Sequence, residues 1–305
     1  MALIRQWLAR LRPVEFLLLG YVAIVTVPVI LRASRYPGCW WLLAAHVLIV
    51  LLVVLASRPD LGPAGRAIRE LYPMILLVGL YSGLDVLNGG GAAAVHDATV
   101  QRWELALFGS QISRTWWQTH PSIFWSTVLH GAYLSYYLIL TLPALWFALH
   151  RRWLGLRQFV FTVMAAFFVC YLFFVFFPVA GPYYAFPRPT GPFVETITAR
   201  LVYGALASGS SYGAAFPSSH VAATLAAAVA AWRGSRRIGL ILAVPTILLT
   251  IAVVYCQMHY GVDALAGLAV GVVVAWVAGR VTGSNGNGPG EVPSPQHSEA
   301  ALVTG

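Results

Sequence analysis

Residues 238–257 read IGLILAVPTILLTIAVVYCQ, twenty residues without a charged side chain. An α-helix needs about 20 predominantly apolar residues to cross the hydrocarbon core of a bilayer. In a water-soluble domain, such a stretch would have to be covered by other parts of the chain on all sides. The stretch therefore predicts a membrane-spanning helix.

Seven other stretches have the same character, at residues 14–31, 40–56, 72–87, 123–149, 158–177, 217–232 and 260–278. The third and sixth of these are short for a full crossing. Together with residues 238–257 they predict an all-α protein, a polytopic transmembrane bundle of about six to eight helices.

The composition supports this class. Of the 305 residues, 59% are hydrophobic and 10% are charged, whereas soluble domains carry about 25% charged residues. A soluble enzyme, a disordered chain and a disulfide scaffold are excluded, and the isolated Cys39, Cys170 and Cys256 are predicted to pack rather than to pair. All 19 basic residues are arginines and are scattered along the chain, so the net charge of +9 indicates topology signals and lipid contacts, not nucleic-acid binding.

The arginines predict an orientation. If the N-terminus is cytoplasmic, 13 of the 19 arginines fall on the cytoplasmic side and 6 on the other side, as the positive-inside rule requires. The first apolar stretch has no small-residue cleavage site and is followed by Arg32 and Arg35, so we expect no cleavable signal peptide. The predicted location is the cell membrane, with several passes.

Three regions are predicted: N-terminal transmembrane helices at 1–90, a catalytic membrane domain at 91–280 and a disordered tail at 281–305, which is rich in Gly, Ser, Pro and Asn. The long connection 88–122 lies on the non-cytoplasmic side. Its tryptophans at 103, 116 and 117 predict an interfacial helix at the level of the lipid headgroups.

Three short stretches carry the polar chemistry: FPVAGPYYAFPRP at 177–189, FPSSH at 216–220 and HYGVD at 259–263. Each adjoins the non-cytoplasmic end of a predicted span. We therefore expect them to form one site on that side of the membrane.

A phosphate group suits these residues. Pro217 and the serines that follow are typical of a helix start, whose free N–H groups and positive end bind anions. Ser218 and Ser219 are predicted phosphate ligands, and Arg188 can clamp phosphate oxygens. His220 would deliver a proton to a leaving oxygen.

His259 and Asp263 are four residues apart, a spacing that predicts both side chains on one helical face. Asp263 would hold one tautomer of the imidazole and stabilise its cationic form. A histidine oriented in this way is a competent nucleophile toward phosphorus.

The Pro-Ser-Ser-His stretch before one helix and the His-Tyr-x-x-Asp stretch before the last resemble the type 2 phosphatidic acid phosphatase superfamily. Within it the chain is most similar to the inositol phosphorylceramide synthase branch, and the resemblance covers about residues 97–278. It implies a phosphohistidine intermediate, with His259 as nucleophile, Asp263 as its orienting partner and His220 as general acid. No cofactor or metal is implied, although two histidines and an aspartate can also imitate a zinc site.

Two cationic positions of the family pattern are absent. The family's first signature has a lysine before Arg-Pro, and here that position is Ala180 or Gly181; the third has Ser-Arg, and here Ala252 and Val253 stand instead. These departures favour the synthase-like branch and leave Arg188, or else Arg200 or Arg114, as the phosphate clamp.

Several alternatives stay open at this stage. The partners are a membrane lipid substrate and either water, which makes a phosphatase, or an alcohol such as inositol or a sugar, which makes a phosphotransferase. A different class, a transporter or channel, would use the intramembrane Asp85 as an ion relay, although Asp85 paired with Ser82 or Asn88 is the simpler interpretation. Asp97 is interpreted as a helix cap or as a pocket residue.

Overall fold

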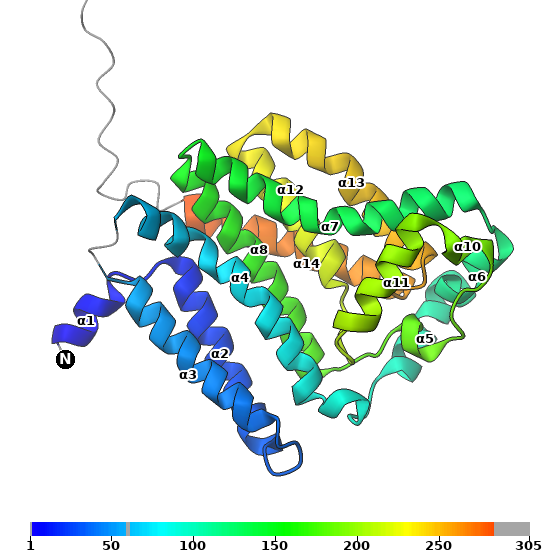
Figure 1. Cartoon of the computed structure of the whole chain (residues 1–305), viewed down its shortest axis with the longest axis horizontal. Helices are drawn as coiled ribbons and strands as arrows, with labels where there is room; N and C mark the ends of the chain where they lie inside the picture. The colour runs from blue at the N-terminus through cyan, green and yellow to red at the C-terminus, as the bar shows by residue number, and fades with distance from the viewer. Residues whose placement is uncertain (1, 59–61, 284–305) are drawn as a thin grey trace, which may run out of the picture.

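The structure is a computed structural model that describes residues 2–58 and 62–283 (Figure 1). These residues form fourteen α-helices and one 3₁₀ turn, with no β-strand among them. The nearest approach to strand pairing is a single parallel bridge between Val179 and Ala214. The predicted all-α class is confirmed.

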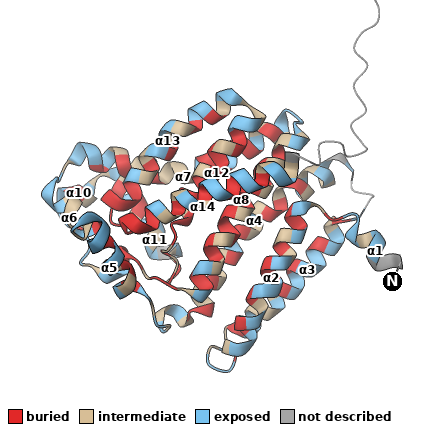
Figure 2. Cartoon of the chain, turned by 180° about the vertical axis from the view of Figure 1, so that it is seen from behind, coloured by how far each residue is buried: buried red, intermediate tan, exposed pale blue. Residues whose placement is uncertain are grey.

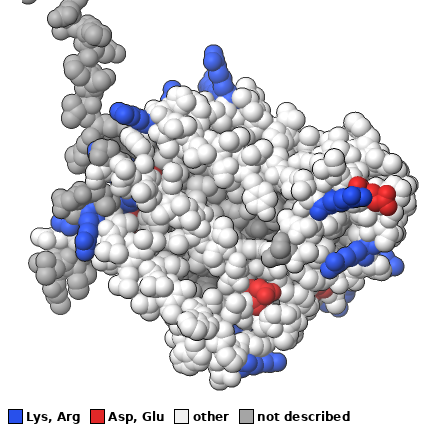
Figure 3. All heavy atoms as spheres, in the orientation of Figure 1, with Lys and Arg blue, Asp and Glu red and all other residues white. Residues whose placement is uncertain are grey.

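Seven of the described helices are long and apolar enough to cross a bilayer. They are α2 (Pro13–Arg32), α3 (Cys39–Ala56), α4 (Pro63–Leu87), α7 (Ile123–Leu149), α8 (Trp153–Phe176), α13 (Arg236–Tyr255) and α14 (Gly261–Gly283). Figure 3 shows a mostly uncharged surface, with charged side chains mainly at its periphery. A multi-pass membrane protein is the consistent description.

The eighth predicted span, 217–232, corresponds to α12 (Ser219–Gly234), which has only 16 residues. At 1.5 Å per residue it is about 24 Å long, shorter than the apolar core of a bilayer. Helices α7, α8, α13 and α14 surround it, and Figure 2 shows the buried residues concentrated there. A Cβ on Gly267 of α14 would lie 2.6 Å from the Ser218 carbonyl oxygen, so small residues let α12 and α14 pack closely.

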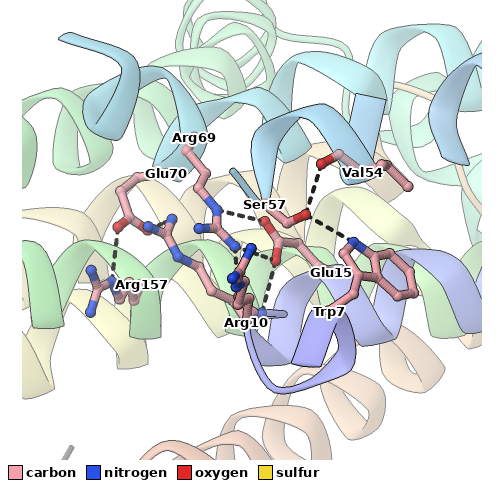
Figure 4. Close-up of polar contacts among 9 residues, drawn as sticks. Trp7, Arg10, Glu15, Val54, Ser57, Arg69, Glu70 and Arg157 are labelled. Atoms are coloured by element: carbon pink, nitrogen blue, oxygen red, sulfur yellow. Dashed lines mark hydrogen bonds and ion pairs between the residues drawn. The ribbon is translucent and has the colours of Figure 1, made fainter. Parts of the chain in front are cut away.

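Buried ion pairs join the N-terminal ends of α2, α4 and α8 (Figure 4). The fully buried Glu15 accepts two hydrogen bonds of 2.9 Å from Arg69. Glu70 is bound by Arg12 at 2.7 Å and by Arg157 at 2.8 Å. Burial lowers the pKa of Arg12 to about 10, and Glu70 opposes this shift. These contacts hold the three helices in register.

The opposite ends of the same three helices also meet. Arg32, at the end of α2, donates to the carbonyl oxygens of Leu87 at 3.2 Å and of Val175 at 3.3 Å. Helices α2, α4 and α8 therefore run in the same direction, as the predicted alternation of spans requires.

We expect Arg69→Ala to destabilise the protein by about 3 kcal/mol, because it leaves the carboxylate of Glu15 buried without its counter-charge. Thermal unfolding of the purified protein in detergent measures the effect as a lower Tm. Arg66→Ala, at an exposed position of the same helix, is the matched control. Equal Tm values for the two variants would contradict the role assigned to the pair.

Short helices cover the far end of the bundle. Between α4 and α7 lie α5 (Asp97–Phe108) and α6 (Ile112–Thr119); between α8 and α12 lie α9 (Pro182–Ala185), α10 (Pro192–Glu195) and α11 (Ile197–Gly209). One further short helix, α1 (Ala2–Leu8), precedes α2.

The predicted interfacial helix is two helices, and its tryptophans differ. Trp103 of α5 is 44% exposed. Trp117 of α6 instead donates to the side chain of Gln257 at 2.9 Å, and Trp116 packs edge-on against Tyr255. Trp116 and Trp117 therefore also pack against the protein, since α6 contacts α13, and the placement of the three tryptophans at the level of the lipid headgroups stays a prediction.

The predicted boundaries at residues 90 and 280 stay predictions. Helix α14 continues to Gly283, so the first residues assigned to the tail are helical. The rest of the predicted tail, 284–305, lies outside the described residues.

Candidate active site

The three polar stretches meet at one end of the bundle. The loop after α8 pairs with the segment before α12, since Val179 donates to the Gly213 carbonyl at 3.1 Å and accepts from Ala215 at 2.9 Å. The start of α12 is tied to α14 by a 3.0 Å hydrogen bond from Ser218 N–H to the carbonyl of Asp263. The predicted convergence of the stretches is present in the fold.

His259 is held by its Nδ1 atom. This nitrogen lies 3.0 Å from the carbonyl oxygen of Ala215 and 3.5 Å from Oδ2 of Asp263. A carbonyl oxygen can only accept, so Nδ1 carries the proton and the neutral ring presents the lone pair of Nε2. The backbone of Ala215 is thus the closer orienting group, and Asp263 adds a negative charge.

The pair does not lie along one helical face as predicted. His259 precedes α14, and Asp263 is in the first turn of that helix. The Oδ2 atom of Asp263 accepts a 2.8 Å hydrogen bond from the N–H of Tyr260. The chain turns sharply just before, at Gln257 with φ +60°, so the four-residue spacing spans a helix start rather than one helical turn.

His220 faces His259 across the pocket, with ring centroids 5.7 Å apart. Its Nε2 lies 3.1 Å from the hydroxyl of Tyr133. The rings of Tyr133 and Tyr136 lie against the imidazole, with centroids 4.9 and 4.4 Å away. Its Nδ1 is buried and has no hydrogen-bond partner among the described residues. These two histidines therefore share one enclosed space.

A small pocket of about 40 Å³ opens at the two histidines. A volume of this size holds a few water molecules, so a phosphorylated headgroup must widen it. Its lining is dominated by hydroxyl groups and small apolar side chains: Tyr81, Tyr133, Ala180, Tyr183, Tyr184, Leu206, Ser210, Ser211, Ala214, Ala215 and Met258. A larger apolar cavity of about 330 Å³ lies between α2, α3 and α4 and contains none of the predicted site residues.

The predicted phosphate ligands occupy two different environments. Ser218 caps α12, its Oγ accepting from the Val221 N–H at 3.4 Å, and both serines are buried. Arg188 is exposed, and its guanidinium lies 4.3 Å from the ring centroid of Tyr183, which lines the pocket. The pocket lining thus includes both histidines but neither Ser218 nor Ser219, and Arg188 approaches it through its contact with Tyr183.

The two other candidate cations lie on helices α6 and α11. The guanidinium of Arg114, on α6, lies 5.6 Å from the ring centroid of Phe186, and Phe186 is in the same loop as Arg188. Arg200 is exposed on α11.

Asp97 is a site residue whose role the sequence left open. Its Oδ2 accepts from the N–H of Ala180 at 2.7 Å, and its Oδ1 accepts from Gly181 N–H at 2.9 Å and from the Tyr260 hydroxyl at 2.8 Å. The interpretation as a cap of its own helix is wrong, because its acceptors serve the pocket loop and the residue after His259.

No role was predicted for Glu104 from the sequence. It is fully buried and accepts hydrogen bonds from Gly261 N–H at 3.1 Å and from Val262 N–H at 3.0 Å. Burial raises the pKa of its carboxyl, and hydrogen bonds from neighbouring backbone N–H groups oppose this shift. A signal was present: Asp97, Gln101 and Glu104 follow the i, i+4, i+7 pattern of one helical face.

Asp85 is half-buried, and its partner is neither Ser82 nor Asn88. Its Oδ1 accepts from the N–H of Tyr212 at 3.1 Å, and Asn88 donates to the carbonyl of that residue at 2.9 Å. The predicted partners are therefore wrong, and Asp85 fixes the loop before α12.

Two observations bear on metals and disulfides. Within residues 2–58 and 62–283 there is no group of three or more His, Cys, Asp or Glu side chains arranged to hold a metal ion. Cys39, Cys170 and Cys256 are each free and buried.

The family model described as the PAP2 superfamily matches residues 98–277. This range contains every predicted catalytic residue as well as Glu104. No curated protein and no solved structure matches the chain.

Proposed function

Because the chain belongs to the PAP2 superfamily over more than half of its length, we propose that it is an integral membrane enzyme that moves the phosphoryl or phosphodiester group of a lipid through a phosphohistidine on His259. Family membership supports the coarser statement, a phosphatase-type activity on a lipid phosphate. The covalent intermediate and the acceptor belong to the proposal.

The first step breaks a phosphorus–oxygen bond. Nε2 of His259 attacks phosphorus, and the bond to the alcohol leaving group breaks as His220 donates a proton to that oxygen. The Ala215 carbonyl keeps the Nδ1 proton in place, and the charge of Asp263 stabilises the cationic ring that forms. The product is a phosphohistidine and a free alcohol.

The second step restores the enzyme. Water or an alcohol attacks the phosphohistidine while His220 takes its proton, and the phosphorus–nitrogen bond breaks. If the attacking group is water the enzyme is a phosphatase, and if it is inositol or a sugar the enzyme is a phosphotransferase. The same residues serve both outcomes.

One observation carries the proposal. The His220 and His259 rings lie 5.7 Å apart and line the same pocket, so both can reach one phosphate group once the pocket widens around it. The anchored Nδ1 of His259 leaves Nε2 as the nitrogen available for attack.

The small number of cationic side chains near the pocket indicates the charge of the substrate. Ala180 or Gly181 stands where the family pattern has a lysine, and Ala252 and Val253 stand where it has Ser-Arg. The guanidinium of Arg188 stacks on Tyr183, which lines the pocket. A phosphodiester carries one negative charge and a phosphomonoester nearly two, so a cation-poor pocket favours the diester. This supports the synthase-like branch, with an inositol or sugar acceptor. The parallel course of α2, α4 and α8 and the excess of arginines at their starting ends favour a site on the non-cytoplasmic face.

An in vitro assay tests the function. Purified protein is offered phosphatidic acid, a prenyl phosphate and phosphatidylinositol, each with and without added inositol or sugar, while free phosphate and all phosphorylated products are measured. Release of free phosphate together with the dephosphorylated lipid supports the phosphatase, and a phosphorylated product that contains the added inositol or sugar supports the transferase. No product from any substrate would contradict the proposal and favour the alternative of a transporter or channel without phosphate chemistry.

A further inference from the structure

Glu104 holds the turn that carries the nucleophile, although it lies far from His259 in the sequence. Its two carboxylate oxygens receive the N–H groups of Gly261 and Val262, at 3.1 and 3.0 Å. These are the first two residues of α14, and they lie between His259 and Asp263. A carboxylate at a helix N-terminus is stabilised by the free N–H groups and by the helix dipole.

A second set of contacts fixes the same turn one residue earlier. The hydroxyl of Tyr260 donates to Asp97 at 2.8 Å and accepts from the Gln101 side chain at 2.9 Å. The backbone N–H of Tyr260 is bound by Asp263 at 2.8 Å. Each of the three residues that follow His259 therefore has a partner on α5.

Helix α5 packs against α14 (Figure 1). Asp97, Gln101 and Glu104 lie on its inner face, while Trp103 and Leu105 on other faces are 44% and 53% exposed. The helix ends at Gly109, which adopts the left-handed conformation with φ +69°, a common helix stop. Its polar face thus has a defined position relative to α14.

The carboxylate of Glu104 is buried, and its hydrogen-bond partners are backbone N–H groups. Burying a charge is costly unless several hydrogen bonds offset the loss of hydration. A purely structural cap does not require it, since serine, threonine, aspartate or asparagine within the chain's own turn serves that purpose. The use of a buried carboxylate from another helix therefore indicates that the turn between His259 and Asp263 must be placed accurately.

We propose that Glu104 is a positioning residue for the phosphoryl-transfer site, holding the Gly261–Val262 backbone so that the His259 imidazole and Asp263 keep their alignment. This inference rests on the proposed function of His259. It also implies that the N–H groups at the start of α14 are already occupied, so that the start of α12 at Ser218–His220 is the helix end available to a phosphate.

Glu104→Gln is the test. The amide oxygen can accept one of the two N–H groups, while the NH₂ group faces the other donor and displaces the turn. Misplacement of a reacting group by about 1 Å can cost about 10²-fold in rate. We expect kcat for the lipid substrate to fall by that factor while KM changes by no more than about threefold, because Glu104 does not line the pocket.

The matched control is Glu195→Gln, which removes an exposed carboxylate from α10; it should retain wild-type kcat and KM. Hydrogen exchange of the peptide covering residues 257–266 gives a readout that needs no substrate. Exchange should be faster in Glu104→Gln than in the wild type and unchanged in Glu195→Gln.

The outcomes separate the two proposals. Wild-type kcat in Glu104→Gln would overturn the positioning role, including the case in which kcat/KM falls only because KM rises. If the wild type turns over no lipid, the proposed function fails, and unchanged exchange at 257–266 would then independently overturn the positioning role. If Glu104→Gln does not fold, Tyr260→Phe removes the hydroxyl link to α5 and keeps both carboxylates; it should lower kcat by about 10-fold, and wild-type kcat would overturn the proposal.

Discussion

His259→Ala is expected to lower turnover of the lipid substrate by about 10⁵-fold or more, since removal of a catalytic nucleophile leaves only the rate that binding and the remaining pocket can support. The variant should fold, because the polar contacts that its side chain loses are those of Nδ1 with the Ala215 carbonyl and with Asp263. Tyr260 keeps its contacts with Asp97 of α5 and with Asp263. Initial rates with purified protein measure the effect.

A second measurement identifies the intermediate. Substrate labelled at phosphorus should leave label on wild-type protein that is quenched under alkaline conditions, in a form that acid removes, because a phosphorus–nitrogen bond is stable in base and labile in acid. The His259→Ala variant should retain none. His150→Ala, at an exposed histidine after α7, is the control and should behave as the wild type. Turnover by His259→Ala at near wild-type rates would rule out a mechanism through a phosphohistidine on His259.

The spans were predictable from sequence because the bilayer imposes a length and a polarity on each helix independently of its neighbours. Residues 238–257 became α13 almost unchanged. The prediction was weakest where neighbouring helices replace lipid: α12 is short because α8, α13 and α14 enclose it, and no local pattern encodes that enclosure. Trp117 illustrates the same limit, since its indole N–H donates to the side chain of Gln257, a contact that no local pattern indicates.

The meeting of the two proposed catalytic histidines was predictable because each lies in a short polar stretch with a recognisable spacing. Their supports were harder to predict. The closest orienting group of His259 is the carbonyl of Ala215, a backbone atom whose direction depends on the pairing of that segment with Val179. Glu104 acts on a turn that follows it by more than 150 residues, so its spacing with Asp97 indicates only a polar face and not what that face binds.

The second large effect is expected for His220→Gln and depends on the leaving group. With the natural alcohol as leaving group, loss of the general acid should lower kcat by about 10³-fold, within the range usual for such groups. A p-nitrophenyl ester of the same phosphate releases p-nitrophenolate, a weak base whose conjugate acid has a pKa of about 7, and this leaving group needs little protonation. The loss in the rate of the first step, measured as the burst of p-nitrophenolate, should therefore shrink to about 10-fold. Rates for both substrates are measured on the wild type and on the variant.

Comparing two substrates on the same variant controls for misfolding, since a misfolded variant would lose both activities equally. The structure favours glutamine as the replacement, because its amide can keep the 3.1 Å contact that His220 makes with the Tyr133 hydroxyl. Only the acidic proton is then lost. An equal loss with the two leaving groups, in a variant whose Tm matches that of the wild type, would assign His220 to phosphate binding rather than proton transfer. The 5.7 Å separation from His259 would then describe two ligands of one anion instead of an acid and a nucleophile.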